Sequence, residues 1–159
     1  MAEIIRREFV KRSVRATVGA TVAAHLIGPK LWAGANDKIQ AACVGVRGQG
    51  KSHIRDLQSV PGVEVVALCD VDERVLAARL KDFEENGLKK SKTFTDIRKL
   101  LEDKDIDVVS FATPNHWHAL GTIWACQAGK DVYVEKPASH NIWEGRKMVE
   151  AARKYNRIV

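Results

Sequence analysis

Cysteine is scarce in this sequence, and the few cysteines are not spaced for bonding. Cys43, Cys69 and Cys126 contain no Cys-x-x-Cys pair, and an odd number of cysteines cannot close into a complete set of disulfides. We therefore expect neither a disulfide framework nor a metal site, and we interpret all three as small buried apolar residues. His116 and His118 lie two residues apart, but no third ligand has a suitable spacing, so we assign no metal to them.

A concentrated basic patch is missing from most of the chain. The formal net charge is +6, but residues 1–35 hold most of the excess, and basic and acidic residues alternate in later segments such as 72–86. Interleaved charges are typical of solvated helix faces, whereas nucleic-acid-binding domains gather lysine and arginine on one surface. The composition therefore argues against nucleic acid as a partner.

No apolar run is long enough to cross a bilayer. The best candidate, residues 16–28, is interrupted by His25 and by glycines. It falls well short of the roughly 20 residues that a spanning helix needs. A basic segment at residues 6–13 precedes this run, and small residues at 33–35 follow it. A basic head, an apolar middle and a small-residue ending are the three parts of an export signal.

The basic head has a specific form. Arg6 and Arg7, followed by Phe9 and Lys11, resemble the signal that the twin-arginine (Tat) translocase reads. This resemblance implies that residues 1–35 are a signal peptide, that the Tat translocase is a transient partner, and that the mature protein is periplasmic. Two alternatives stay open: a retained anchor, and an amphipathic helix that packs on the following domain.

From residue 36 onward, short apolar runs alternate with helical patterns. Each run is continuously apolar, as expected of strands that are buried on both faces of a parallel sheet. The pattern predicts an α/β domain over residues 36–159 with a Rossmann-like, doubly wound parallel sheet. The expected strands are residues 39–46, 63–70, 107–113 and 131–136, with a weaker one at 92–94.

Polar residues before the helical patterns indicate where the helices begin. The expected caps are Asp72 (helix to about 86, stopped by Gly87), Asp96 (helix to 101), Asn115 and Asn141, and a helix without a cap is expected from about Ser52. Residues 157–159 read as the start of a sixth strand, which indicates that the chain is truncated before a further domain.

The first strand is followed by a glycine-rich segment, GVRGQG. Gly45 and Gly50 occupy the first and third positions of the dinucleotide fingerprint GxGxxG, while Arg47 stands at the second and Gly48 is its nearest substitute. Asp70 ends the second strand, where a carboxylate can accept hydrogen bonds from ribose hydroxyls and repel the extra phosphate of NADP. We therefore predict NAD as the cofactor. The alternatives are a tight turn without a ligand, a helix-capping role for Asp70, and an Arg47 that points into solvent instead of toward the pyrophosphate.

Two later segments make the prediction of an NAD-binding domain more specific. ATPNHWHA at residues 112–119 and VYVEKPASHN at 132–141, together with GVRGQG and CDVDER, resemble the Gfo/Idh/MocA oxidoreductases, the relatives of glucose-fructose oxidoreductase and inositol dehydrogenase. The resemblance covers most of residues 38–159. It implies the N-terminal NAD-binding domain of a protein that normally continues into a second α/β domain.

The resemblance also implies roles for individual residues. Lys136 would lie beside the nicotinamide and contact the substrate, and an ammonium group there can stabilise a developing alkoxide or relay its proton. Glu135 would orient Lys136, and a cis bond before Pro137 would fix the turn that presents it. The turn Thr113–Pro114–Asn115 would border the cofactor, and His118 would pack or hydrogen-bond beside it. An ordinary surface lysine is the alternative for Lys136, and Trp117 is assigned equally to a substrate pocket or to packing.

These residues predict an NAD-dependent oxidoreductase that acts on a sugar or polyol hydroxyl. The substrate class comes from the resemblance alone. One alternative is an NAD-dependent glycoside hydrolase that oxidises a sugar hydroxyl transiently, and another is a catalytically incomplete NAD-binding fragment. Family members usually supply a catalytic histidine and an acid from beyond the EKP segment, and they often associate through their second domain. We therefore expect no oligomer from this domain alone.

Overall fold

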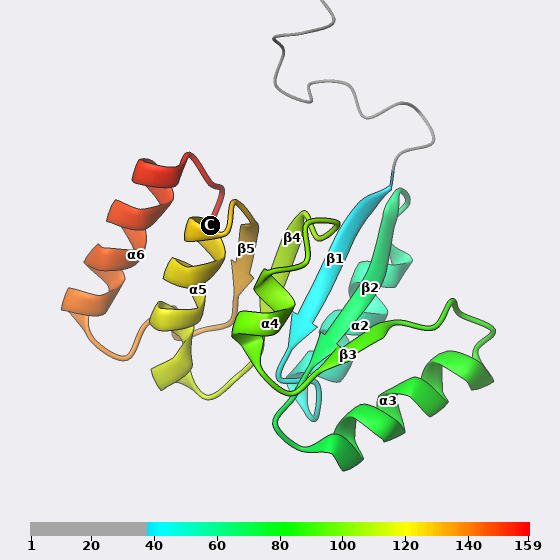
Figure 1. Cartoon of the computed structure of the whole chain (residues 1–159). Helices are drawn as coiled ribbons and strands as arrows, with labels where there is room; N and C mark the ends of the chain where they lie inside the picture. The colour runs from blue at the N-terminus through cyan, green and yellow to red at the C-terminus, as the bar shows by residue number, and fades with distance from the viewer. Residues whose placement is uncertain (1–37) are drawn as a thin grey trace, which may run out of the picture. The chain divides into compact units, whose positions relative to one another are not determined.

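The computed structural model describes residues 38–159, in which five parallel strands form one sheet in the order β3-β2-β1-β4-β5 (Figure 1). The strands are β1 (Ile39–Val44), β2 (Val63–Cys69), β3 (Lys92–Phe94), β4 (Val108–Phe111) and β5 (Asp131–Val134). This order is that of dinucleotide-binding doubly wound sheets. The predicted fold class is therefore confirmed, whereas the expected signal peptide, residues 1–35, lies outside the described residues.

Helices cover both faces of the sheet. They are α2 (Gln49–Ser59), α3 (Glu73–Glu85), α4 (Ile97–Leu101), the short 3₁₀ turn η1 (Asn115–Trp117), α5 (His118–Gln127) and α6 (Ile142–Tyr155). In Figure 1, α2 lies behind β1 and β2, while α4 lies in front of the sheet. Right-handed crossovers between parallel strands place successive helices in this way.

Two separate apolar cores result, one on each face. Cys43 of β1 packs with Phe83 of α3 in the first core, which also contains residues of α2. The next residue along β1, Val44, belongs to the second core together with Leu100 of α4 and Phe111 of β4. Adjacent residues of a strand point to opposite faces, so a strand covered on both sides must be apolar throughout.

The capping residues account for most of the helix starts. Asp72, Asp96 and Asn141 each accept a hydrogen bond from a backbone N–H two or three residues later, at 2.9 to 3.0 Å. Gly87 follows α3 with a φ of 64°, a conformation that costs glycine little. These four predictions of helix ends are confirmed.

Two predicted helix starts are wrong. α2 begins at Gln49, ahead of Ser52, and therefore takes Gly50 into its first turn. Asn115 does not cap α5, because it lies in η1 and α5 starts only at His118. The extended Pro114 (ψ 143°) leads into the 3₁₀ turn, and this tighter turn displaces the start of the α-helix.

No sixth strand is formed within residues 38–159. The backbone N–H of Val132 nevertheless donates to the carbonyl of Ile158 at 2.9 Å, and the N–H of Ile158 donates to the Asp131 carboxylate at 2.9 Å. The segment therefore lies along the outer edge of β5, where a sixth strand of this fold class would begin.

The three cysteines are buried and unbonded, as expected. Burial raises the pKa of the Cys43 thiol to about 12, because a thiolate is poorly solvated in an apolar core. Among residues 38–159, no helix is both long enough and apolar enough to span a membrane.

Candidate functional site

The site is fixed by the point at which the strand order reverses. β1 lies between β2 and β4 in the sheet. The chain runs from β1 to β2 on one side and from β4 to β5 on the other, so the loops after β1 and β4 lead away from each other. Open α/β sheets bind ligands in the crevice at this position, outside the carboxyl ends of the strands. Gly45 follows β1 here, and Ala112 follows β4.

Two cavities flank this point. A cavity of about 600 Å³ lies on the β2 and β3 side, and its lining includes Gly45, Asp70, Thr113 and Trp117. A second, of about 430 Å³, lies on the β5 side and is lined by Gln49, Ala112, Thr113, Asn115, His118, Glu135, Lys136 and Pro137. We call them the Asp70 pocket and the Lys136 pocket. Thr113 contributes to both, so together they form a binding region that runs along the carboxyl ends of the strands.

The glycine turn brings α2 close to β1 and β4. Gly45 has a φ of 79°, and a Cβ on it would lie 2.8 Å from the carbonyl oxygen of Ala112. A Cβ on Gly50 would overlap the carbonyl oxygen of Gly45. Gly48, in contrast, faces open space, so packing does not require a glycine there. Gly48 lines a groove between α2 and α3 instead of either pocket.

The N-terminus of α2 lacks a side-chain cap, because the capping residue is Gly48. The backbone N–H of Lys51 donates to the carbonyl of Gly48 at 3.0 Å, which leaves the N–H groups of Gln49 and Gly50 available to an external acceptor. Together with the helix dipole, they suit a phosphate group.

The Asp70 carboxylate is held in place by backbone groups. One oxygen accepts from the N–H of Val46 at 3.0 Å, and the other accepts from the N–H of Asp72 at 3.0 Å. A carboxylate has about four acceptor positions, so both oxygens can still accept from hydroxyl groups. Asp70 thus presents an oriented acceptor at the wall of its pocket.

Arg47 does not line either pocket. Its guanidinium contacts the Asp72 carboxylate at 2.7 Å, and its side chain is 72% exposed. The sequence left open whether Arg47 points toward a pyrophosphate or into solvent. In the structure, Arg47 instead reaches Asp72 at the start of α3. The expected contact of Arg47 with the cofactor stays a prediction.

Thr113 supplies a test of whether a cofactor fits. Its hydroxyl oxygen is buried and has no hydrogen-bond partner among the described residues. A buried hydroxyl without a partner costs free energy unless a ligand or water satisfies it. With the close glycine turn and the uncapped α2, this hydroxyl makes the site compatible with a bound dinucleotide.

Glu135 is held by three donors. The imidazole Nε2 of His53 lies 2.9 Å from one carboxylate oxygen, and the amide of Gln49 donates to the same oxygen at 3.3 Å. The backbone N–H of Lys136 donates to the other oxygen at 3.0 Å. The hydrogen bond from His53 is the main reason that the pKa of Glu135 is lowered, so the carboxylate stays ionised at neutral pH.

His53 is itself buried between two partners. Its Nδ1 lies 2.8 Å from the hydroxyl of Ser110 on β4, and its ring meets Tyr133 edge-on. Ser110 is 3% exposed, so this Ser–His–Glu arrangement does not present a nucleophile to a substrate. Its effect is to hold the Glu135 carboxylate in one position.

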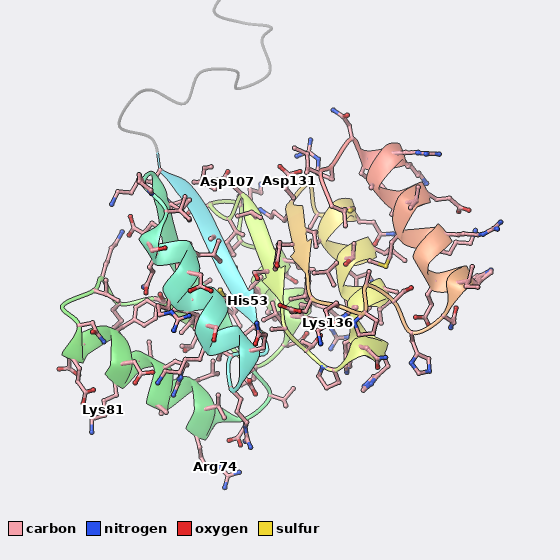
Figure 2. All side chains as sticks on the ribbon, turned by 180° about the vertical axis from the view of Figure 1, so that it is seen from behind. His53, Arg74, Lys81, Asp107, Asp131 and Lys136 are labelled. Carbon is pink, nitrogen blue, oxygen red and sulfur yellow. The ribbon has the colours of Figure 1, made fainter. Side chains whose placement is uncertain are left out.

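Lys136 is exposed at the carboxyl end of β5. Figure 2 shows it near His53, at the carboxyl ends of the strands, whereas Asp107 and Asp131 lie at the amino ends. The Lys136–Pro137 bond is cis, as considered from the sequence. Lys136 lines the Lys136 pocket at the carboxyl ends of the strands, where open α/β sheets bind ligands.

His118 and His116 have different surroundings. His118 is buried, and its two ring nitrogens lie 2.8 Å from the carbonyl oxygens of Thr113 and Pro137. It therefore ties together the two turns that line the Lys136 pocket. His116 is exposed and lines a separate groove between α5 and α6. No group of three metal-ligating side chains occurs within residues 38–159.

Sequence reasoning missed His53, Gln49 and Ser110. The signal for His53 was present, because Gly50, His53 and Ile54 follow the spacing of one helix face, and all three are buried. A histidine on an otherwise inward-facing stripe requires a polar partner, but the identity of that partner depends on which strands lie under the helix.

Fold and site together define a dinucleotide-binding α/β domain. The family model described as oxidoreductase family, NAD-binding Rossmann fold (GFO_IDH_MocA) matches residues 39–159, and the chain belongs to this family. The predicted family and the predicted cofactor, NAD, are therefore confirmed.

Several relatives show how far the similarity extends. A glycosyl hydrolase family 109 protein from Shewanella baltica is 30% identical over 97% of this chain, and another from Shewanella pealeana is 31% identical over 81%. This chain spans only 38% and 28% of the length of these two curated relatives.

Solved structures are also similar to this chain over part of their length. The WlbA dehydrogenase from Chromobacterium violaceum, in complex with NADH and UDP-GlcNAcA, is 27% identical with a TM-score of 0.69, over 83% of this chain and 36% of its own. The myo-inositol dehydrogenase from Lactobacillus casei, in complex with NAD(H) and myo-inositol, is 27% identical with a TM-score of 0.68, over 74% and 34%.

Proposed function

We propose that this protein is an NAD-dependent oxidoreductase that acts on a hydroxyl group of a sugar or polyol. The observation that carries the proposal is the Lys136 pocket, in which an ammonium group and a fixed carboxylate lie next to the crevice where this fold binds dinucleotides. The substrate class is supported by dehydrogenase relatives that were crystallised with inositol or a nucleotide sugar.

In this proposal the residues at the carboxyl ends of the strands would hold the cofactor. Asp70 would accept hydrogen bonds from the adenosine ribose, the N-terminus of α2 would bind the diphosphate, and Lys136 would lie on the nicotinamide side. Thr113 lines both pockets, and its unpartnered hydroxyl would gain a hydrogen-bond partner from the ligand. Bound NAD supplies the hydride acceptor.

The protein's own groups manage the proton and the developing charge. The Lys136 ammonium donates a hydrogen bond to the substrate hydroxyl oxygen and stabilises the negative charge that develops there as the hydroxyl proton passes to water. Glu135, ionised and held by His53, fixes the backbone at Lys136 through their hydrogen bond. Lys136 is thus the catalytic residue, and Glu135 and His53 are positioning residues.

The experiment is to replace Lys136 with Met and measure NADH formation at 340 nm with a panel of sugars and polyols. We expect turnover to fall by roughly a hundredfold or more, while the variant still binds NAD. Lys104→Gln, an exposed lysine on a loop away from both pockets, is the matched control. Wild-type turnover in Lys136→Met would remove this residue from the mechanism.

A second candidate function is favoured by the family 109 glycosyl hydrolases, which match 97% of this chain at 30% identity. An NAD-dependent glycoside hydrolase oxidises a sugar hydroxyl, eliminates the glycosidic alcohol, adds water to the resulting double bond and reduces the ketone again, and in this candidate the same Lys136 region would lie beside the cofactor. The two functions differ in a simple measurement. Net accumulation of NADH supports the dehydrogenase, whereas aryl-glycoside cleavage without net NADH supports the hydrolase.

A further inference from the structure

Asp72 binds two arginines that come from different parts of the chain. Arg47, in the glycine-rich turn, contacts one carboxylate oxygen through Nη2 at 2.7 Å. Arg74, on α3, contacts the same oxygen through Nη2 and the other through Nε, both at 3.0 Å. The two arginine side chains are 72% and 90% exposed, whereas the Asp72 side chain is 20% exposed. The Asp72 carboxylate therefore forms ion pairs with two guanidinium groups whose side chains otherwise face solvent.

This cluster lies directly beside the proposed ribose site. The backbone N–H of Asp72 donates to the Asp70 carboxylate at 3.0 Å, and the N–H of Val46, next to Arg47, donates to its other oxygen. Any ligand whose ribose hydroxyls reach Asp70 therefore brings its 2′ position close to Asp72 and the two guanidinium groups.

NADP differs from NAD only by a phosphate ester at that 2′ position. Guanidinium groups are the usual partners of such a phosphate, because their planar fork donates two hydrogen bonds at once. A site with two arginines beside the ribose carboxylate would therefore be suited to NADP if the arginines were free. Here both are engaged by Asp72.

We propose that Asp72 is a specificity-determining residue: it holds Arg47 and Arg74 away from a 2′-phosphate and adds a second negative charge to that of Asp70, so that the site takes NAD and rejects NADP. This inference rests on the proposed function, in which Asp70 binds the adenosine ribose.

The helix cap alone does not explain the arrangement. Asp96 caps α4 and binds Arg98 in the same way that Asp72 caps α3 and binds Arg74, through the backbone N–H, Nε and Nη2. No described residue from the glycine-rich turn reaches Asp96, whereas Arg47 crosses to Asp72. The contact from Arg47 is thus what distinguishes Asp72 from an ordinary helix cap.

The charge on Asp72 persists at physiological pH. The hydrogen bond from Arg74 is the main cause that lowers the pKa of this carboxyl to about 2, with Arg47 contributing through its charge. No pH change within the ordinary range releases the arginines. Substitution is therefore the way to free them.

The test is to titrate the full chain and its variants with NAD and with NADP, following tryptophan fluorescence, since Trp117 and Trp124 line the Asp70 pocket. Asp72→Asn removes the charge but keeps a good helix cap, and Asp72→Ser is a second uncharged capping variant. We expect the ratio of the NADP to the NAD dissociation constant to fall by roughly tenfold in both variants, as one or two charge-assisted hydrogen bonds become available to the phosphate.

Two further variants make the test specific. Adding Arg47→Gln to Asp72→Asn should abolish at least half of the gain in NADP affinity, because one of the released guanidinium groups is then absent. Glu85→Gln removes a carboxylate at the other end of α3, where it pairs with Lys81, and should leave the ratio unchanged.

An unchanged ratio in both Asp72 variants, with NAD still bound, would overturn the role of Asp72 and leave the proposed function standing. A gain that persists in full after Arg47→Gln would overturn the role of Arg47. A folded wild-type chain that binds neither dinucleotide would overturn the proposed function, and this inference with it.

Discussion

His53 connects α2 to the turn that carries Lys136. Its two ring nitrogens contact Ser110 on β4 and Glu135 after β5, and both its burial and the edge-on contact with Tyr133 restrict its rotation. Glu135 in turn accepts from the backbone of Lys136. A residue on α2 therefore helps to set the position of the proposed catalytic residue after β5.

At the residue scale, the glycine turn offers a direct stability test. Gly50→Ala should destabilise the fold by about 1–3 kcal/mol, because the added methyl group overlaps the Gly45 carbonyl and forces α2 away from β1. Gly48→Ala, whose Cβ faces open space, is the matched control and should have a much smaller effect. Urea unfolding followed by circular dichroism measures both, and equal stability of the two variants would contradict the packing described.

Some residues of the site follow from sequence, and others do not. Gly45, Gly50 and Asp70 were predictable because a tight strand-to-helix turn and a carboxylate at a strand end have local signatures. The His53–Glu135 contact joins residues 82 positions apart, and the Arg47–Asp72 contact joins residues 25 apart. Such contacts depend on strand order and helix placement, which residue spacing alone does not contain.

At the element scale, the helix caps make part of the stability depend on pH. The hydrogen bond from Arg98 is the main cause that lowers the pKa of Asp96 to about 2 from an ordinary value of 3.8. A carboxylate whose pKa is depressed by folding contributes stability above its unfolded pKa, and that contribution is lost as the pH falls through the folded value. Asp96 should therefore stabilise α4 above about pH 4 and cease to do so near pH 2.

Asp96→Asn tests this expectation, because asparagine keeps the cap and removes the charge. The melting temperature of the variant should lie below that of the wild type at pH 6, and the difference should vanish toward pH 2. Asp96→Ser, a second uncharged cap, should behave in the same way as Asp96→Asn. A difference that stays constant from pH 6 to pH 2 would show that the charge of Asp96 is not the cause.

The strands were more predictable than the helix starts. Strands buried on both faces must be apolar throughout, so β1, β2, β4 and β5 stand out as continuous runs, each one to three residues shorter than expected. The start of α5 was misplaced because asparagine is a common helix-capping residue. In the structure, Pro114 leads into a 3₁₀ turn that contains Asn115, so α5 begins three residues later.

At the scale of the whole molecule, the chain is shorter than the relatives that it matches. It spans 28–38% of the length of the family 109 proteins that it matches, and 34–36% of the length of the dehydrogenase structures described above. Dinucleotide binding is thus expected of the described residues alone. Turnover is a proposal for the protein as a whole, and NAD binding without turnover is what a catalytically incomplete domain would show.

We also propose, at the scale of the whole molecule, that residues 1–35 direct export. We expect Arg6→Lys combined with Arg7→Lys to block delivery to the periplasm, since the twin arginine is the feature that the Tat translocase reads. Arg15→Lys, outside the pair, is the matched control and should be exported normally. Cell fractionation and immunoblotting measure the distribution, and periplasmic delivery of the double variant would exclude the Tat route.

In the proposed function, a dinucleotide would lie along the carboxyl ends of the strands, between Asp70 and Lys136. Titration of the folded wild-type chain with NAD, followed by calorimetry, tests it most directly. We predict saturable binding at one site per chain, weakened by Asp70→Ser, which removes the charged acceptor from the pocket. A folded sample that shows no saturable binding of NAD would contradict the account.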